Sequence, residues 1–243
     1  MDIIDEAYRQ EFLATFYNNA QKWEREVVCT YKFTDLPEGT AVLDLERSRM
    51  SEKKEFPWLT DDSIDWKAWC NINDPDYKST NRLVDFLVDV VSKNGALLLN
   101  ITPRADGTIP EPVRERLLAV GDWLRINGEA IYDTRPWKIY GEGPQEIMEG
   151  HLSESQNPEA TAEDIRFTTK GKQLYATVLD WPGEELIIRS LGSNVQLLEN
   201  PIQQIKMLGA KGELEWVREA DGLKIRLPNV RPCEHAFVLK ITL

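Results

Sequence analysis

Two carboxylates that share a predicted strand are the best chemical candidates in this sequence. Asp44 and Glu46 fall in the alternating segment Thr40–Glu46 (TAVLDLE), which predicts a β-strand. Residues two apart on a strand share a face, so both side chains would project to the same side. A carboxyl group beside a second carboxylate keeps its proton to higher pH and can serve as an acid. The alternative is a solvated pair of charges that bind Arg47 and Arg49.

Other catalytic chemistries have few residues to work with. The chain has two histidines, His151 and His235, and three widely spaced cysteines, Cys29, Cys70 and Cys233. They form neither a Cys-x-x-Cys motif nor a metal-ligand spacing, so we expect no metal, no other cofactor and no disulfide scaffold. A Ser-His-Asp triad is not expected either. Carboxylates would therefore carry the acid–base work if the protein is an enzyme.

Composition limits the partners of the chain. Its 243 residues carry a formal net charge of −12, which speaks against a nucleic acid partner. No apolar run approaches the roughly 20 residues that a membrane span requires, and no signal peptide is recognised at Met1. The eight tryptophans are many for this length. Most are expected in the core, although Trp beside polar loops is also typical of sugar-binding surfaces.

Helical and strand-like segments alternate in the first half of the chain, which predicts an α/β fold. The expected helices are Glu6–Trp23, Ser79–Lys93 and Pro110–Ile126, and the expected strands are Glu26–Phe33, Thr40–Glu46 and Ala96–Ile101. The run ALLLNI at 96–101 is typical of a parallel strand buried on both faces. The polar, Trp-rich segment Ser48–Pro75 is predicted to be a long functional loop, in which Asp61, Asp62 and Asp65 act as caps.

The second half has a different periodicity. Seven short alternating segments occur between Ile165 and Leu243, with Gly, Pro and Asn between them. This pattern predicts an antiparallel β-sandwich without α-helices. The segment Gly141–Ala162 has the composition of a linker, so we expect two domains, 1–142 and 143–243.

Ordered motifs in the first half resemble one enzyme family. The segment Leu87–Trp137 carries VSKNG, LLLNI, PRADGTIP and NGEAIYDTRPW, and upstream FYNNAQKWEREVVCTYKF, AVLDLER and FPWLTDDSI occur in order. Together they are similar to family 29 glycoside hydrolases, the α-L-fucosidases, over about residues 5–140. The tail resembles the C-terminal β-sandwich of the same family.

The resemblance implies a fold and a reaction. These enzymes have a (β/α) barrel followed by a sandwich, and they release terminal L-fucose from glycans with retention of configuration. Retention needs a nucleophile and an acid/base. We therefore expect α/β plus all-β architecture, with strands five to eight of a TIM-like barrel before the antiparallel sandwich. The implied ligand is a fucosylated oligosaccharide or glycoconjugate, and the implied parent enzyme is secreted or periplasmic.

Three residues inherit expected roles from the resemblance. Glu46 matches the family acid/base on the sixth barrel strand, and Lys32 falls where many members carry an Arg or Lys that faces the sugar. Trp69 falls where members place an aromatic ring against fucose, although an anchor in the core is equally expected. The nucleophilic Asp of the fourth strand has no counterpart, because the chain opens with the helix that should follow that strand.

Two functions follow. The first is a truncated α-L-fucosidase, inactive alone because it lacks the half that bears the nucleophile. The alternative is a non-catalytic carbohydrate-binding or assembly module derived from a fucosidase. Four barrel strands leave two open edges and an apolar face. The chain is therefore expected to self-associate or to bind a complementary N-terminal half.

Overall fold

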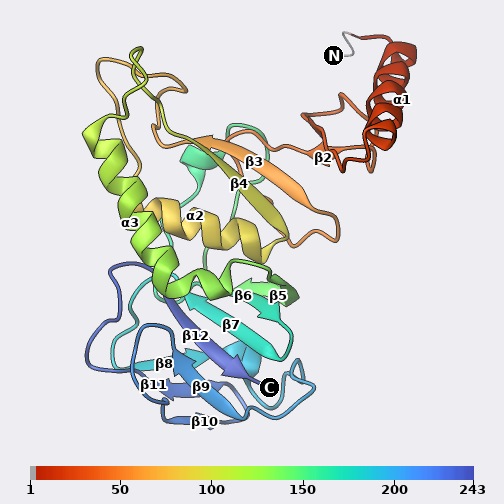
Figure 1. Cartoon of the computed structure of the whole chain (residues 1–243). Coiled ribbons are helices and arrows are strands. Elements are labelled where there is room, and N and C mark those ends of the chain that lie inside the picture. Colours follow the sequence, from red (N-terminus) through yellow and green to blue (C-terminus); the bar gives the residue numbers. More distant parts are fainter. Residues whose placement is uncertain (1–3) are drawn as a thin grey trace.

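The computed structural model describes residues 4–243, which form an α/β part and an all-β part (Figure 1). The α/β part contains α1 (Glu6–Lys22), β1 (Thr30–Tyr31), β2 (Val42–Leu43), β3 (Trp58–Ser63), α2 (Thr80–Ser92), β4 (Gly95–Asn100) and α3 (Glu111–Asn127). All three predicted helices are confirmed. The Ser79 hydroxyl caps α2 by accepting the N–H of Arg82, and α3 begins directly after Pro110. No helix within residues 4–243 is both long and apolar enough to cross a membrane.

The strands of the α/β part form a partial barrel. β1 pairs with β2 and β3 pairs with β4, both in parallel, and a parallel bridge between Asp44 and Leu59 joins the two pairs. The backbone hydrogen bonds between these strands continue beyond β2, where the N–H of Arg47 donates to the Asp61 carbonyl. The strands expected at 26–33 and 40–46 are thus present but shortened to two residues each.

The segment predicted as a long loop contains a strand. β3 occupies Trp58–Ser63, inside the range 48–75, so the loop prediction is wrong there. The adjacent Asp61 and Asp62 interrupt the alternation of apolar and polar residues that would indicate a strand. Asp61 lies on the face that bears Lys32, whereas Asp62 is buried against the Lys78 ammonium. The expected cap role is therefore wrong for both. It is confirmed for Asp65, whose Oδ1 accepts the N–H of Lys67 and of Asp76.

The apolar strand β4 is covered on one face, not on both as predicted. Leu97 and Leu99 pack into clusters with side chains of α2 and its neighbours. Leu98, on the opposite face, is 59% exposed. Figure 1 shows α2 between β3–β4 and the all-β part, with α3 alongside, so these helices can cover only one side of the strand.

The all-β part is an antiparallel sandwich, as predicted. Its strands are β5 (Arg135–Glu142), β6 (Ile165–Lys170), β7 (Gln173–Val178), β8 (Glu185–Ile188), β9 (Gln204–Met207), β10 (Trp216–Arg218), β11 (Leu223–Arg226) and β12 (Phe237–Thr242). One sheet has the order β5-β6-β7-β12-β9, and the other has the order β10-β11-β8. Short 3₁₀ turns occur at Gly128–Ala130, Glu154–Gln156 and Arg189–Leu191. The predicted strands between 165 and 243 all occur, and that range of the described chain contains no α-helix.

The two parts meet along α2, α3 and the larger sheet. β5 lies within the range expected for the barrel, yet it pairs with β6 of the sandwich; the division at 142 itself stays a prediction. Trp123 of α3 packs with Tyr175 and Val238 from the outer face of the sheet. Its indole N–H donates to the carbonyl of Ala236 at 2.7 Å.

A buried ion cluster also crosses this contact. The Asp89 carboxylate on α2 binds Lys93 at 2.8 Å, Arg166 of β6 at 2.5 Å and Arg49 at 3.4 Å. Burial alone would raise the pKa of Asp89, but these three cations hold it well below its usual range. Burial and the neighbouring arginines lower the pKa of Lys93 to about 8, although Asp89 opposes this shift. Asp89 is thus the negative centre of the contact between the two parts.

Candidate functional site

A lysine gathers three carboxylates at the ends of neighbouring parallel strands. The Lys32 Nζ lies 3.0 Å from Glu46 Oε2, 2.8 Å from Asp61 Oδ1 and 3.4 Å from Asp44 Oδ2. We call these four residues the carboxylate cluster. The Glu46 side chain is 28% exposed, so a ligand can reach it.

Strand register explains why these side chains meet. Asp44 bridges Leu59, so two residues further along both strands Glu46 lies beside Asp61 on the same face. Lys32 directly follows the Tyr31–Leu43 pair, which places it beside Asp44. All four residues lie toward the carboxyl ends of their strands. In (β/α) barrels this is the end at which active sites are built.

The charges in the carboxylate cluster perturb one another. Burial opposes the charge on Lys32, but hydrogen bonds to Asp61 and Glu46 outweigh it and raise the pKa of Lys32 to about 12. Burial and the charge of Asp61 raise the pKa of Asp44, which Lys32 only partly offsets. The lysine therefore stays protonated while it holds the carboxylates together.

Arg47, which directly follows Glu46, connects Trp69 to the carboxylate cluster. The Arg47 guanidinium lies 5.2 Å from the Trp69 ring centre, and it also donates to the carbonyls of Asp65 and Trp66 at 2.7 and 2.8 Å. Asn100 at the end of β4 donates to the Trp69 carbonyl at 2.7 Å. The Trp69 residue is 36% exposed and so lies at the surface. The structure thus brings Lys32 and Glu46 into contact and places Trp69 against the residue that follows Glu46.

Sequence reasoning missed two members of the site. Asp61 was expected to cap a loop, and its assignment to a strand would have revealed that it shares a face with Glu46. His151 accepts the Glu46 N–H at Nδ1 with a distance of 3.1 Å. No pattern around His151 indicates this contact, because its partner lies 105 residues earlier in the chain.

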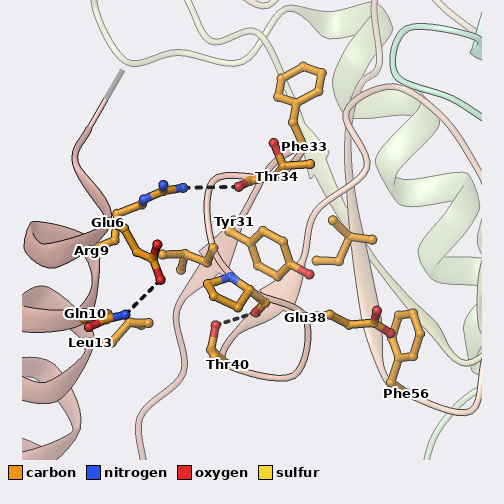
Figure 2. Close-up of a pocket in the computed structure, with 13 residues that line it drawn as sticks. Glu6, Arg9, Gln10, Leu13, Tyr31, Phe33, Thr34, Glu38, Thr40 and Phe56 are labelled. Atoms are coloured by element: carbon orange, nitrogen blue, oxygen red, sulfur yellow. Dashed lines mark hydrogen bonds between the residues drawn. The ribbon is translucent and has the colours of Figure 1, made fainter. Parts of the chain in front are cut away.

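A separate groove lies on the other face of β1. Figure 2 shows Tyr31 pointing into this groove, which is about 720 Å³ and lies between α1 and the turn after β1. Arg9 of α1 closes one wall by donating to the Thr34 carbonyl at 3.4 Å. Tyr31 and Lys32 are consecutive in an extended segment, so their side chains point to opposite faces. The groove is therefore distinct from the carboxylate cluster.

Comparisons with known proteins agree with this architecture. A family model described as "Alpha-L-fucosidase" matches residues 3–129, and one described as "Alpha-L-fucosidase C-terminal domain" matches residues 156–242. The rat tissue α-L-fucosidase is 30% identical over 96% of this chain and 48% of its own length. The human tissue α-L-fucosidase is 36% identical over 77% of this chain and 37% of its own length.

Solved structures show the same fold. An α-fucosidase from Thermotoga maritima, crystallised with a mechanism-based inhibitor, matches with a TM-score of 0.72 and 25% identity. The match covers 97% of this chain and 49% of that one. A second α-L-fucosidase matches with a TM-score of 0.76 and 24% identity, over 98% of this chain and 50% of its own. The chain thus spans about half the length of the relatives it matches. On these matches, the chain belongs to the α-L-fucosidase family.

Proposed function

We propose that the chain supplies the acid/base half of an α-L-fucosidase active site. Glu46 acts as the acid/base, Lys32 orients both Glu46 and the sugar, and Trp69 forms part of the wall around the sugar. The ligand is a fucosylated oligosaccharide or glycoconjugate. The observation that carries the proposal is the 3.0 Å contact between Lys32 and Glu46 at the ends of neighbouring parallel strands.

The contacts of Lys32 suit a residue that exchanges partners when sugar binds. Its ammonium has three N–H donors facing three carboxylates, so it can give up one of these contacts and keep the other two. Moving onto a sugar hydroxyl would free Glu46 for the leaving-group oxygen, while Asp61 could still hold the ammonium. The partial exposure of Lys32 and Glu46, 27% and 28%, leaves room for this exchange.

The second carboxyl group of a retaining reaction comes from elsewhere in this proposal. Retention requires a nucleophile that forms a glycosyl-enzyme intermediate. We assign it to the half of the relatives that this chain does not match. The uncovered face of β4, with Leu98 59% exposed, is where a complementary barrel half or a second copy of the chain would pack.

Turnover of an aryl α-L-fucoside tests this proposal. The purified chain alone should show no turnover. Mixed with the separately produced N-terminal half of a relative, and with association checked by light scattering, it should release the aryl group. Glu46→Gln should then lower kcat by about 10²–10⁴-fold. The control Glu55→Gln removes a carboxylate that is 91% exposed and should leave kcat unchanged.

Two results would contradict the proposal. Turnover by the chain alone, abolished in Glu46→Gln, would mean that this half holds both carboxyl groups. An associated, active mixture in which Glu46→Gln keeps full kcat would remove Glu46 from the reaction.

A further inference from the structure

A segment between the two parts of the chain reaches back to the carboxylate cluster. The His151 Nδ1 accepts the N–H of Glu46 at 3.1 Å. The same imidazole lies over the ring of Phe33, with ring centres 3.9 Å apart. Phe33 directly follows Lys32. One side chain therefore contacts both strand ends that carry the Lys32–Glu46 pair.

The backbone at these two strand ends is strained. Phe33 has φ +51° and Arg47, directly after Glu46, has φ +46°. Residues with a side chain keep such left-handed conformations only where their surroundings hold them. His151 packs on Phe33, and the N–H of Glu154 donates to the Arg47 carbonyl at 2.9 Å. The segment from His151 to Glu154 thus supports both strained positions.

This segment has anchors of its own. The Glu154 carboxylate binds Arg82 of α2 at 2.7 Å and is buried with it. The Ser153 hydroxyl bonds to the Ser48 hydroxyl at 2.7 Å. The Leu152 N–H also donates to the Glu46 carbonyl at 2.8 Å, so α2, Ser48 and the backbone of Glu46 together hold His151 against the Glu46 N–H.

We propose that His151 is a positioning residue that fixes Glu46 against Lys32 by accepting the Glu46 N–H at Nδ1. The inference rests on the proposed role of Glu46 as the acid/base. The Glu46 N–H is a donor, so Nδ1 must accept and Nε2 must carry the proton of the neutral ring. A proton on Nδ1 would set two donors against each other and break the bond. The geometry of the Lys32–Glu46 contact then depends on an acceptor at the place of Nδ1.

The charges near His151 are engaged with other partners. The charged residues directly beside Phe33 and Glu46 in the chain, Glu46 itself, and those within three residues of His151 are Lys32, Glu46, Arg47, Glu149 and Glu154. Lys32 binds Glu46, and Arg47 donates to backbone carbonyls. Glu149 accepts from Ser51 and Glu154 binds Arg82. With these charges paired elsewhere, the Nδ1 of His151 is left to the Glu46 N–H.

Hydrogen exchange of the Glu46 amide in the full chain tests the bond. His151→Asn keeps an acceptor near the place of Nδ1, whereas His151→Leu keeps only the apolar contact with Phe33. We expect exchange about tenfold faster in His151→Leu, and near the wild-type rate in His151→Asn. The amide of Phe167, buried in the sandwich, reports any general loss of structure.

Chemical reactivity of Lys32 tests the consequence for the site. Brief acetylation at pH 9 is read by mass spectrometry, with the exposed Lys211 as the internal reference. Lys32 should be labelled several-fold more in His151→Leu than in the wild type, and to the same extent in His151→Asn as in the wild type. The reason is that a displaced Glu46 lets the pKa of Lys32 fall from about 12 and frees its amine.

Equal Glu46 exchange in all three chains would overturn the inference. Unchanged Lys32 reactivity in His151→Leu would also overturn it, because His151 would then be merely structural. Neither readout requires turnover, so these outcomes are independent of those that test the fucosidase proposal.

Discussion

In the sandwich, the two sheets supply both walls of one core, whereas in the partial barrel helices cover one face of β4 and Leu98 on the other face stays exposed. The sandwich core includes Phe167, Leu174 and Ile225, each 0% exposed. The carboxylate cluster belongs to the open part, where Lys32, Asp44 and Glu46 follow strands of only two residues and Asp61 lies in β3. We therefore expect the closed part to contribute most of the stability, whereas the open part holds the candidate site.

The largest effect should come from the closed core. Phe167→Ala removes a fully buried ring that packs edge-to-face on Trp137, with centres 5.2 Å apart. We expect a loss of about 3–5 kcal/mol in the free energy of unfolding, measured by urea denaturation. Phe12→Ala on α1, where the residue is 53% exposed, is the matched control and should cost about 0.5 kcal/mol. Equal losses of unfolding free energy in the two variants would show that the sandwich core does not contribute more stability than the α/β part.

The ion cluster between the two parts should rank next. Asp89→Asn leaves Lys93 and Arg166 buried without the Asp89 carboxylate, while Arg49 keeps Glu154, so we expect a loss of about 3 kcal/mol at neutral pH. The pKa of Asp89 is lowered in the folded chain, so its contribution is fully present above the unfolded value of about 4 and is lost as pH falls below it. Denaturation from pH 7 to pH 2 checks this. If the free energy of unfolding falls as steeply at acid pH in Asp89→Asn as in the wild type, groups other than Asp89 cause that fall.

The same contrast governs what could be predicted from sequence. The sandwich strands were foreseen because alternation of apolar residues is local, and α2 because Ser79 caps an apolar face. β3 was missed because Asp61 and Asp62 satisfy their charges far along the chain, against Lys32 and Lys78. Local pattern cannot show such partners.

The candidate site shows the same limit. Glu46 and Lys32 were named through family motifs, and the structure places them in contact. Asp61 and His151 could not be added, because their contacts depend on the register of neighbouring strands and on a return of the chain after 105 residues. The acid/base role of Glu46 and the substrate-binding roles of Lys32 and Trp69 stay predictions.

A smaller stability effect is expected in the carboxylate cluster. Lys32→Met removes a partly exposed ammonium, so the free energy of unfolding should change by about 1 kcal/mol or less. The local effect should be larger. Lys32 lowers the pKa of Asp44 against the opposing effects of burial and Asp61, so in Lys32→Met that pKa should rise further. Carbon-13 NMR titration of the Asp44 carboxyl measures it. Lys67→Met, at an ion pair with Asp74, is the control, and a shift of Asp44 in that variant would point to a general charge effect.

The smallest effect on stability, and the sharpest contrast within one strand, should come from β4. Leu98→Ser changes a residue that is 59% exposed, so the free energy of unfolding should stay within about 0.5 kcal/mol of the wild type. Its neighbour Leu97 packs with Trp58 and Phe86, and Leu97→Ser should cost about 2 kcal/mol.

For association, Leu98→Ser should have the larger effect and Leu97→Ser the smaller one. If the uncovered face of β4 is where a second copy or a complementary barrel half packs, Leu98→Ser should weaken association in light scattering, because it removes apolar surface from the contact. Leu97→Ser, on the covered face, should associate as the wild type does once it is folded. A wild-type chain that is a monodisperse monomer of about 28.0 kDa with one cooperative melt would refute the packing proposal. The uncovered face of β4 would then be stable without any partner.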